Sequence, residues 1–303
     1  MAKIAVMGAG AVGCYYGGML ALAGEAVTLI GRPGLVAQVR REGLIFEKGG
    51  ETRLLPMAAT EGPEGVAGAE IVLFCVKSAD TEAAGQAMLP HLAPGAVVLS
   101  LQNGISNAER LSAVLGRPVI PAVVYVASQM GGAGHVVHHG RGELVLGEEP
   151  GADGAAAVLN AAGIGTEVSA GAAVAMWTKL VINCAFNALS ASTLQPYGRI
   201  GAEPGALETM RAIVAECRAV AGAEGIALPD TLEAQVEAIT RSMAGQISST
   251  AQDVTLRKPT EIAFLNGEIV ARGDRAGVPV PLNRALSVIV RLIEARYREP
   301  QTS

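Results

Sequence analysis

A glycine-rich turn near the amino terminus limits the fold of this chain more than any other feature. The turn, Gly8-Ala-Gly-Ala-Val-Gly13, follows an apolar run over residues 3–7 and opens a second apolar stretch that ends at Gly24. A buried strand, a tight turn and a helix over residues 11–23 explain this order, and residues 26–30 form the next strand. Glycine at the first, third and sixth positions of such a strand–turn–helix unit is typical of a dinucleotide-binding fold.

Each glycine of the turn has a separate physical role. Gly8 permits the tight bend after the strand, and Gly13 lets the helix pack closely on it. Gly10 carries no side chain, so a pyrophosphate can approach the backbone at the helix N-terminus, where unpaired N–H groups and the helix dipole favour an anion. The residues that we predict to bind the cofactor here are Gly8, Ala9, Gly10, Ala11, Val12 and Gly13.

The end of the second strand indicates which dinucleotide is bound. Chains that bind NAD place an acidic residue here to bind the ribose 2′-hydroxyl group, whereas this chain has Ile30-Gly31-Arg32. The planar guanidinium group of Arg32 suits a 2′-phosphate, so we expect NADP(H) in preference to NAD. Lys77, which follows a central strand over 70–76, either adds positive charge for the same phosphate or is an ordinary loop lysine.

The remaining pattern divides the chain into two parts. Half of the residues are apolar but only 3% are aromatic, which suits parallel strands of small aliphatic residues covered by helices. Residues 43–58 should form two flanking strands, and 135–138 with 143–146 a hairpin, whereas the second half of the chain has mainly helical periodicity. We predict an α/β fold, with a Rossmann-type doubly wound sheet over 1–169 and an all-α C-terminal domain over 170–303. The other expected strands are 96–101 and 119–127, and the other expected helices are 35–41, 81–89, 152–162, 177–187, 206–223, 231–241, 260–276 and 282–297.

Charge and cysteine usage argue against several classes of protein. The net charge is −5 and the Lys and Arg residues are scattered, so no nucleic-acid partner is expected. The four cysteines are far apart in apolar contexts, and no ligand spacing accompanies the histidines. We therefore expect free thiols, no metal site and a cytoplasmic protein. An apolar signal or membrane anchor over residues 4–23 is the competing interpretation, which the repeated glycines of that segment disfavour.

One apolar segment of the second domain carries a polar stripe. In the segment 177–187, Lys179, Asn183 and Asn187 recur at i, i+4 and i+8, so they share one face of a helix. A lysine and two amides are costly to desolvate unless they face a polar partner. The stripe therefore indicates a surface that faces a ligand, with a satisfied helix–helix contact as the alternative. The apolar neighbours that should be buried are Leu180, Val181, Ile182 and Phe186.

Two further polar positions lie at element ends where ligands are commonly bound. Asn103-Gly104 follows a strand at its carboxyl end, where open α/β sheets bind ligands, so Asn103 should face the nicotinamide; a plain Asn-Gly turn is the alternative. Glu261 should lie in the first turn of a helix, where a carboxylate suits the dipole. Lys179 is the only cation on the stripe.

Taken in order, these residues resemble the ketopantoate reductase (2-dehydropantoate 2-reductase) family. The resemblance covers essentially the whole chain and implies NADPH-dependent reduction of 2-dehydropantoate, a small 2-oxo acid, to (R)-pantoate in pantothenate biosynthesis. By the same resemblance Lys179 is the general acid and Glu261 supports it, and Arg32 and Lys77 bind the 2′-phosphate. The residues that resemble the family's substrate-binding residues are Asn103, Asn183, Asn187 and Ser249. The motifs that carry the likeness are the glycine turn, Lys77, Asn103-Gly104, the stripe, Ser248-Ser249 and Thr260-Glu261-Ile-x-x-x-Asn266-Gly267.

One position departs from the family pattern. In the loop after the stripe, where relatives often carry an asparagine, this chain has Tyr197. Another short 2-oxo acid is therefore an alternative substrate, and a non-catalytic NADP-binding sensor is an alternative of a different class. The high apolar content of the helical domain is also consistent with a homodimer.

Overall fold

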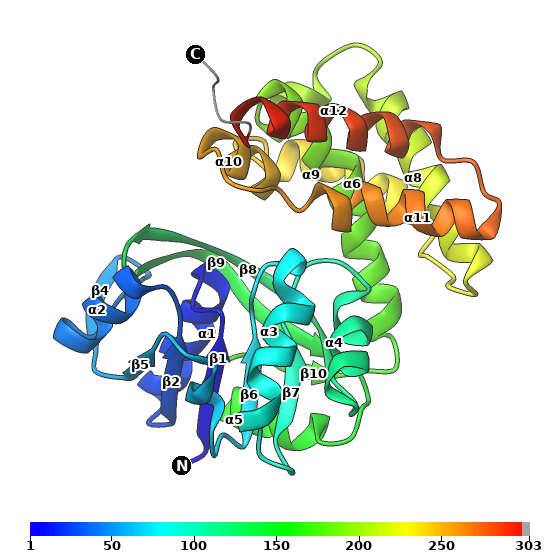
Figure 1. The fold of residues 1–303 in the computed structure, drawn as a ribbon. Helices are drawn as coiled ribbons and strands as arrows, with labels where there is room; N and C mark the ends of the chain where they lie inside the picture. Colours follow the sequence, from blue (N-terminus) through cyan, green and yellow to red (C-terminus); the bar gives the residue numbers. More distant parts are fainter. Residues whose placement is uncertain (299–303) are drawn as a thin grey trace. The chain divides into compact units, whose positions relative to one another are not determined.

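A computed structural model describes residues 1–298, which form two compact units, Met1–Ala172 and the residues from Ala173 onward. The first unit is a sheet covered by helices and the second is helical (Figure 1). The predicted fold class, a Rossmann-type α/β sheet followed by helices, is confirmed. The expected functional division into residues 1–169 and 170–303 stays a prediction.

The first unit is built on a single ten-stranded sheet. Its strands are β1 (Lys3–Met7), β2 (Ala26–Ile30), β3 (Leu44–Lys48), β4 (Glu51–Leu55), β5 (Ala58–Thr60), β6 (Ile71–Phe74), β7 (Val97–Ser100), β8 (Ile120–Gly132), β9 (His135–Leu146) and β10 (Thr166–Val168). The order across the sheet is β4-β3-β9-β8-β7-β6-β1-β2-β5, and β10 pairs with β9. Both neighbours of β1, namely β2 and β6, pair with it in parallel, so the loops after these three strands leave the same edge of the sheet.

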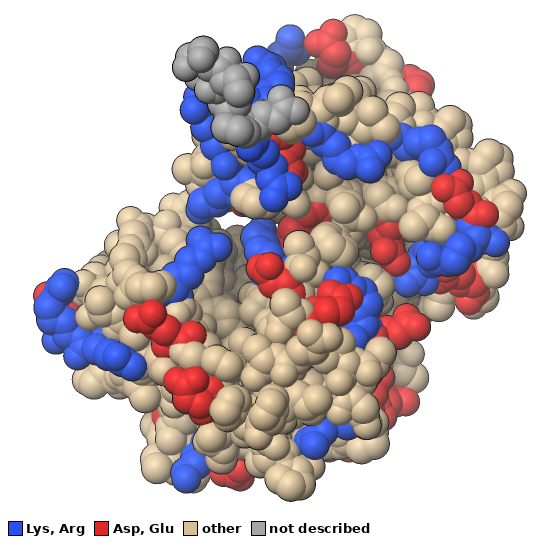
Figure 2. Space-filling view, in the orientation of Figure 1, with Lys and Arg blue, Asp and Glu red and all other residues tan. Residues whose placement is uncertain are grey.

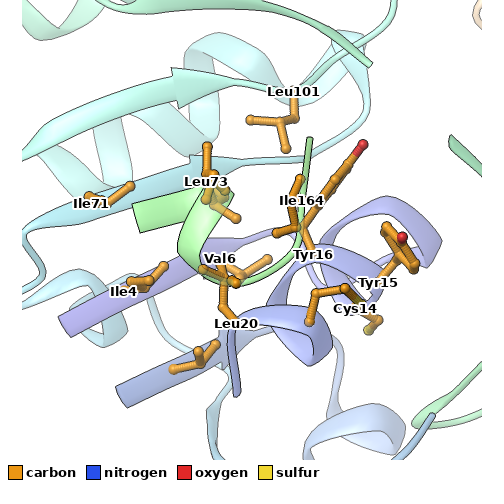
Figure 3. Packing of buried hydrophobic residues seen from close by; sticks show 14 of the residues in the cluster. Ile4, Val6, Cys14, Tyr15, Tyr16, Leu20, Ile71, Leu73, Leu101 and Ile164 are labelled. Carbon is orange, nitrogen blue, oxygen red and sulfur yellow. The ribbon is translucent and has the colours of Figure 1, made fainter. Parts of the chain in front are cut away.

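Helices bury both faces of this sheet. The helices of the unit are α1 (Ala11–Leu22), α2 (Pro33–Glu42), α3 (Thr81–Met88), α4 (Asn107–Leu115) and α5 (Ala152–Ala161). Because side chains alternate along a strand, Ile4 and Val6 of β1 pack with α1 and α5, whereas Ala5 and Met7 pack with α3 and α4. Figure 3 shows Leu20 of α1 beside Val6 on the first of these faces. Figure 1 shows α3 and α4 side by side on the other face, over β6 and β7.

The structure corrects two predictions in the first unit. Residues 135–138 and 143–146 do not form a hairpin; both lie in β9, which pairs antiparallel with β8. Arg141 has a left-handed φ of 60° between two glycines of positive φ, and this irregular segment bends β9 without ending it. Helix α4 was not predicted, and β8 extends to Gly132, beyond its expected end.

The second unit contains the helices α6 (Ala172–Thr193), α7 (Tyr197–Gly201), α8 (Ala206–Ala223), α9 (Leu232–Ser242), α10 (Ser249–Thr255), α11 (Asn266–Ala276) and α12 (Pro281–Arg298). The single helix predicted over 260–276 is wrong. Glu261 precedes a short 3₁₀ turn, Ile262–Phe264, and α11 begins only at Asn266, because Leu265 has φ and ψ values of −112° and −103° that no helix adopts. The expected place of Glu261 in the first turn of that helix is therefore wrong as well.

Among residues 1–298, α6 is the one helix that is long and apolar enough to cross a membrane by length and composition, and half of its most apolar stretch is buried within the protein. Core helices of globular proteins meet the same two criteria. The segment 4–23, the competing membrane anchor, forms β1, the glycine turn and α1.

Candidate active site

The turn after β1 is held against the end of β2. The backbone N–H groups of Gly8 and Ala9 both donate to the carbonyl oxygen of Ile30, at 3.1 and 2.8 Å. Gly8 has a φ of 102°, and a Cβ atom there would lie 2.6 Å from the backbone nitrogen of Val76. Both the backbone conformation and the neighbouring loop therefore require glycine at this position.

The other two glycines of the turn differ in what surrounds them. A Cβ atom at Gly13 would lie 2.5 Å from the carbonyl oxygen of Gly8 and 2.7 Å from Cγ1 of Val6, so this glycine permits helix and strand to pack. A Cβ atom at Gly10 would contact nothing within 4 Å. Gly10 is the N-cap of α1, which has no side-chain cap and no acidic residue in its first turn. This open helix N-terminus fits the pyrophosphate of a dinucleotide.

Arg32 and Lys77 follow the two strands that flank β1. Arg32 is the exposed N-cap residue of α2, two residues after the carbonyl group of Ile30 to which the turn is bonded. No hydrogen bond or ion pair within residues 1–298 engages the Arg32 guanidinium group, so it is available to an anion. Lys77 is an exposed residue of the loop after β6. The structure thus brings both predicted cations to the sheet edge that carries the glycine turn.

Asn103 lies in the loop after β7, next to the loop that carries Lys77. Four buried polar side chains connect the two loops, namely Ser78, Thr81, Gln102 and Asn107. None of these four residues was predicted from the sequence. Two of them could have been noticed, because Ser78 and Gln102 are the sequence neighbours of the predicted site residues Lys77 and Asn103. The sequence does not show whether the side chains of Ser78 and Gln102 are buried or exposed, because that depends on the tertiary structure.

The polar stripe of α6 has the predicted helical spacing. Three of its apolar neighbours are buried as predicted, with exposed fractions of 1% for Leu180, 0% for Val181 and 0% for Phe186, whereas Ile182 is only partly buried. Asn187 is just 2% exposed. In the described part of the chain, no hydrogen bond engages the side-chain amide of Asn183 or Asn187. Two amide groups on one helical face are therefore available to a polar ligand.

Ser249 lies close to this stripe because its neighbour Ser248 is bonded to α6. The Ser248 hydroxyl group donates to the carbonyl oxygen of Asn187 at 3.4 Å and accepts from the N–H of Ala251 at 3.0 Å, which caps α10. The N–H of Ser248 also donates to the hydroxyl oxygen of Ser190 at 3.2 Å. These bonds bring Ser249, the exposed first residue of α10, next to the end of the stripe.

The backbone around Glu261 is fixed by its neighbour Thr260. Both the N–H and the hydroxyl group of Thr260 donate to the buried carboxylate of Glu294 on α12, at 3.1 and 2.6 Å. Glu261 follows directly in the chain, so the bonds of Thr260 limit where its carboxylate can lie.

The cysteines and histidines have ordinary structural environments. Cys14 and Cys184 are buried free thiols, and burial raises the pKa of Cys14 to about 12 and that of Cys184 well above its usual value. His138 stacks on Tyr15 with ring centroids 4.6 Å apart. Within residues 1–298, no three His, Cys, Asp or Glu side chains are grouped so that they could hold a metal ion. On the face of the first unit in Figure 2, acidic and basic side chains are interspersed.

Comparisons with known proteins agree with this arrangement. The chain matches the family described as ketopantoate reductase PanE/ApbA over residues 4–151, and the corresponding C-terminal family over residues 173–294. It is 34% identical to a 2-dehydropantoate 2-reductase of Halobacterium salinarum, over 96% of this chain and 99% of that protein. It is 33% identical to one of Archaeoglobus fulgidus, over 97% of this chain and 98% of that protein.

Solved structures show the same fold. A PanE/ApbA family ketopantoate reductase from Ralstonia eutropha is 50% identical with a TM-score of 0.96, covering 98% of this chain and 100% of that chain. D-mandelate dehydrogenase shares the fold at 24% identity with a TM-score of 0.91, covering 98% of this chain and 100% of that chain.

The fold, the polar residues and these relatives define an oxidoreductase that acts on CH–OH groups. The family matches span both units of the structure. The chain belongs to the ketopantoate reductase family.

Proposed function

We propose that this protein reduces 2-dehydropantoate to (R)-pantoate with NADPH, as a step in pantothenate biosynthesis. The observation that carries the proposal is the pair of unbonded amides, Asn183 and Asn187, one and two turns after Lys179 on α6. The substrate has a carboxylate, a ketone and a hydroxyl group, and an amide can both donate to and accept from such groups. Ser249 beside the stripe and Asn103 in the first unit complete the proposed substrate-binding residues.

The cofactor proposal rests on the first unit. The residues proposed to hold the NADPH pyrophosphate are those of the glycine turn, Gly8, Ala9, Gly10, Ala11, Val12 and Gly13. The support is the open space at Gly10 and the uncapped N-terminus of α1. Arg32 and Lys77 are proposed to bind the 2′-phosphate, since no acidic residue stands in the sequence Ile30-Gly31-Arg32 to favour a free ribose hydroxyl group.

The proposed chemistry assigns the proton to Lys179. When bound, NADPH supplies the hydride that reduces the carbonyl carbon. The Lys179 ammonium group stabilises the negative charge that develops on the ketone oxygen and donates a proton to it. Glu261 is proposed to accept a hydrogen bond from the substrate hydroxyl group and to support the lysine. Asn103 is proposed to orient the nicotinamide and the carbonyl group.

A second candidate substrate is another short 2-oxo acid. The observation that favours it is that Tyr197, the position at which the family resemblance implies a departure, packs in the core of the second unit. An amide lost from a substrate site weakens discrimination for the group that it bonded, because a specific hydrogen bond contributes more to selectivity than an apolar contact does.

Spectrophotometric oxidation of NADPH tests both candidates. We expect kcat/KM for 2-dehydropantoate to exceed that for pyruvate and 2-oxobutyrate by about 100-fold or more. Equal, slow rates with all three acids would favour the second candidate. Tight NADPH binding without turnover of any of them would contradict the proposed function and favour the sensor role.

We also propose a cytoplasmic homodimer. Val288, Ile289 and Leu292 on α12 are 40%, 43% and 63% exposed and form an apolar strip on the second unit, which suits an interface with a second copy. Light scattering after size-exclusion chromatography should give twice the mass of one chain, and Leu292→Glu should give a monomer. A monomeric wild-type protein at micromolar concentration would contradict this proposal.

A further inference from the structure

The loops after β6 and β7 are joined by the four buried side chains Ser78, Thr81, Gln102 and Asn107, which we call the loop clamp. Their exposed fractions are 0%, 0%, 7% and 2% respectively. Each loop carries a proposed site residue, Lys77 in the first and Asn103 in the second. Polar groups buried this deeply are retained only where their hydrogen bonds are made.

Gln102 bonds the second loop to the first through its side-chain amide. Its Nε2 group donates to the carbonyl oxygen of Val76 at 3.0 Å and to the hydroxyl oxygen of Thr81 at 2.8 Å. Its Oε1 atom accepts from the Ser100 hydroxyl group at 3.0 Å. Since Val76 precedes Lys77 and Gln102 precedes Asn103, this one side chain holds the backbone next to both site residues.

Asn107 bonds the same two loops from the start of α4. Its Nδ2 group donates to the carbonyl oxygen of Asn103 at 2.6 Å and to the hydroxyl oxygen of Ser78 at 3.1 Å. The Ser78 hydroxyl group in turn donates to the carbonyl oxygen of Asn103 at 3.3 Å. The Oδ1 atom of Asn107 accepts from Nη1 of Arg110 at 3.0 Å, which orients the amide so that its N–H groups face the loops.

We propose that Gln102 and Asn107 are positioning residues that hold Lys77 and Asn103 in one fixed relation for cofactor binding and hydride transfer. The inference rests on the proposed function of those two residues. Neither clamp amide needs to touch the substrate or the cofactor. The two amides instead restrict the two adjacent loops to one conformation. This restriction matters because a shift of about 1 Å in a positioned group can lower the rate about 100-fold.

The variant Asn107→Asp tests this proposal with little change in shape. The carboxylate keeps an acceptor for Arg110 but cannot donate to Asn103 or Ser78, so the carbonyl oxygen of Asn103 loses its hydrogen bond from the side chain at position 107. We expect kcat with 2-dehydropantoate to fall by about 10- to 100-fold and the Kd of NADPH to rise by about 3- to 10-fold. The matched control is Asn160→Asp, the same change at a residue of the first unit whose side chain bonds only Thr166, and both constants should stay within about twofold.

Double variants distinguish positioning from a merely structural role. If the clamp acts through Asn103, the fall in kcat caused by Asn107→Asp should shrink to within about twofold in the Asn103→Ala background. If it acts through Lys77, the rise in the Kd of NADPH should shrink likewise in the Lys77→Ala background. Full additivity in both backgrounds, or a lowered Tm with unchanged kcat and Kd, would overturn the inference.

Two further measurements keep the result decisive. If Asn107→Asp does not fold, Gln102→Met removes the donors to Val76 and Thr81 at similar side-chain length, and the same expectations apply. If the wild-type protein binds NADPH but does not reduce 2-dehydropantoate, the proposed function fails while the Kd measurements with Lys77→Ala still test the clamp.

Discussion

Tyr197 packs its ring against Phe186, with the ring centroids 4.4 Å apart and the ring planes tilted by 35°. Phe186 lies on α6 next to Asn187 and is fully buried, and Tyr197 is only 9% exposed. Burial also raises the pKa of the Tyr197 hydroxyl group to about 12. Tyr197 is thus part of the apolar core behind the stripe, and its hydroxyl group forms no hydrogen bond within the described residues.

We predict that Tyr197→Phe leaves the enzyme almost unchanged. The ring contact with Phe186 is kept and no hydrogen bond is lost. We therefore expect kcat/KM to stay within about twofold of the wild-type value, and the free energy of unfolding to stay within about 0.5 kcal/mol of it. Tyr197→Ala should lower the free energy of unfolding by about 3 kcal/mol or more, because it leaves a cavity beside Phe186. A tenfold loss of kcat/KM in Tyr197→Phe would show that the hydroxyl group binds substrate.

Lys179→Ala should lower kcat by about 100-fold or more while leaving the Kd of NADPH nearly unchanged, because the proposed general acid is lost and the cofactor site in the first unit is intact. Steady-state kinetics and fluorescence titration with NADPH measure the two quantities. Thr178→Ala, at the adjacent position off the stripe, is the control and should keep kcat within about twofold. Full activity of Lys179→Ala would remove this residue from the mechanism.

Arg32→Asp should weaken NADPH binding by about 10-fold or more and change NADH binding little, because only NADPH carries the 2′-phosphate that the guanidinium group is proposed to bind. The control Arg41→Asp makes the same charge change at an exposed position of the same helix. Comparing the two variants separates the loss of a direct contact with the 2′-phosphate from the general effect of a more negative protein surface. An equal loss of affinity for NADPH and NADH in Arg32→Asp would show that the 2′-phosphate does not bind at Arg32.

Gly10→Ala and Gly13→Ala should fail in different ways. A methyl group at Gly13 meets the Gly8 carbonyl oxygen and Val6, so this variant should lose about 1–3 kcal/mol of stability, measured by urea unfolding. A methyl group at Gly10 meets no protein atom within 4 Å, so stability should be kept while NADPH affinity falls by about 10-fold or more. Unchanged NADPH affinity in Gly10→Ala would contradict the proposed pyrophosphate site.

The pair Glu82–Arg110 should add a small acid sensitivity to the helices beside the loop clamp. Hydrogen bonds from Arg110, at 2.7 and 2.6 Å, lower the pKa of Glu82 below its usual value near 4.5. A carboxyl group whose folded pKa is lowered stabilises the protein above its unfolded pKa, and this stabilisation is lost as the pH falls through the folded value. Because the Glu82 side chain is 46% exposed, the effect should be about 0.5 kcal/mol or less.

Urea unfolding of the wild-type protein and of Glu82→Gln, at about pH 7 and about pH 3, measures this contribution. The difference in stability between the two pH values should be smaller in the variant, because the glutamine does not titrate. An equal difference in both proteins would assign the acid sensitivity to other carboxylates.

The features that follow local rules could be predicted from the amino-acid sequence. The glycine turn between β1 and α1 depends on backbone conformation at single residues, and the common face of Lys179, Asn183 and Asn187 depends only on the helical period. The apolar runs before Arg32, Lys77 and Asn103 predicted three strands, and these residues follow the ends of those strands. The family resemblance rested on the same short segments in their order along the chain.

Features that depend on contacts between distant segments were decided by the tertiary structure alone. Pairing with β8 on both sides of the irregular segment keeps β9 extended through the glycines around Arg141, where the local pattern had predicted a turn. Likewise, Gln102 bonds Val76 because β6 and β7 pair in parallel, which brings two loops 26 residues apart to one edge of the sheet. Periodicity and turn preferences act over a few neighbouring residues, whereas strand pairing and the partner of a buried amide are set by the packing of the whole unit.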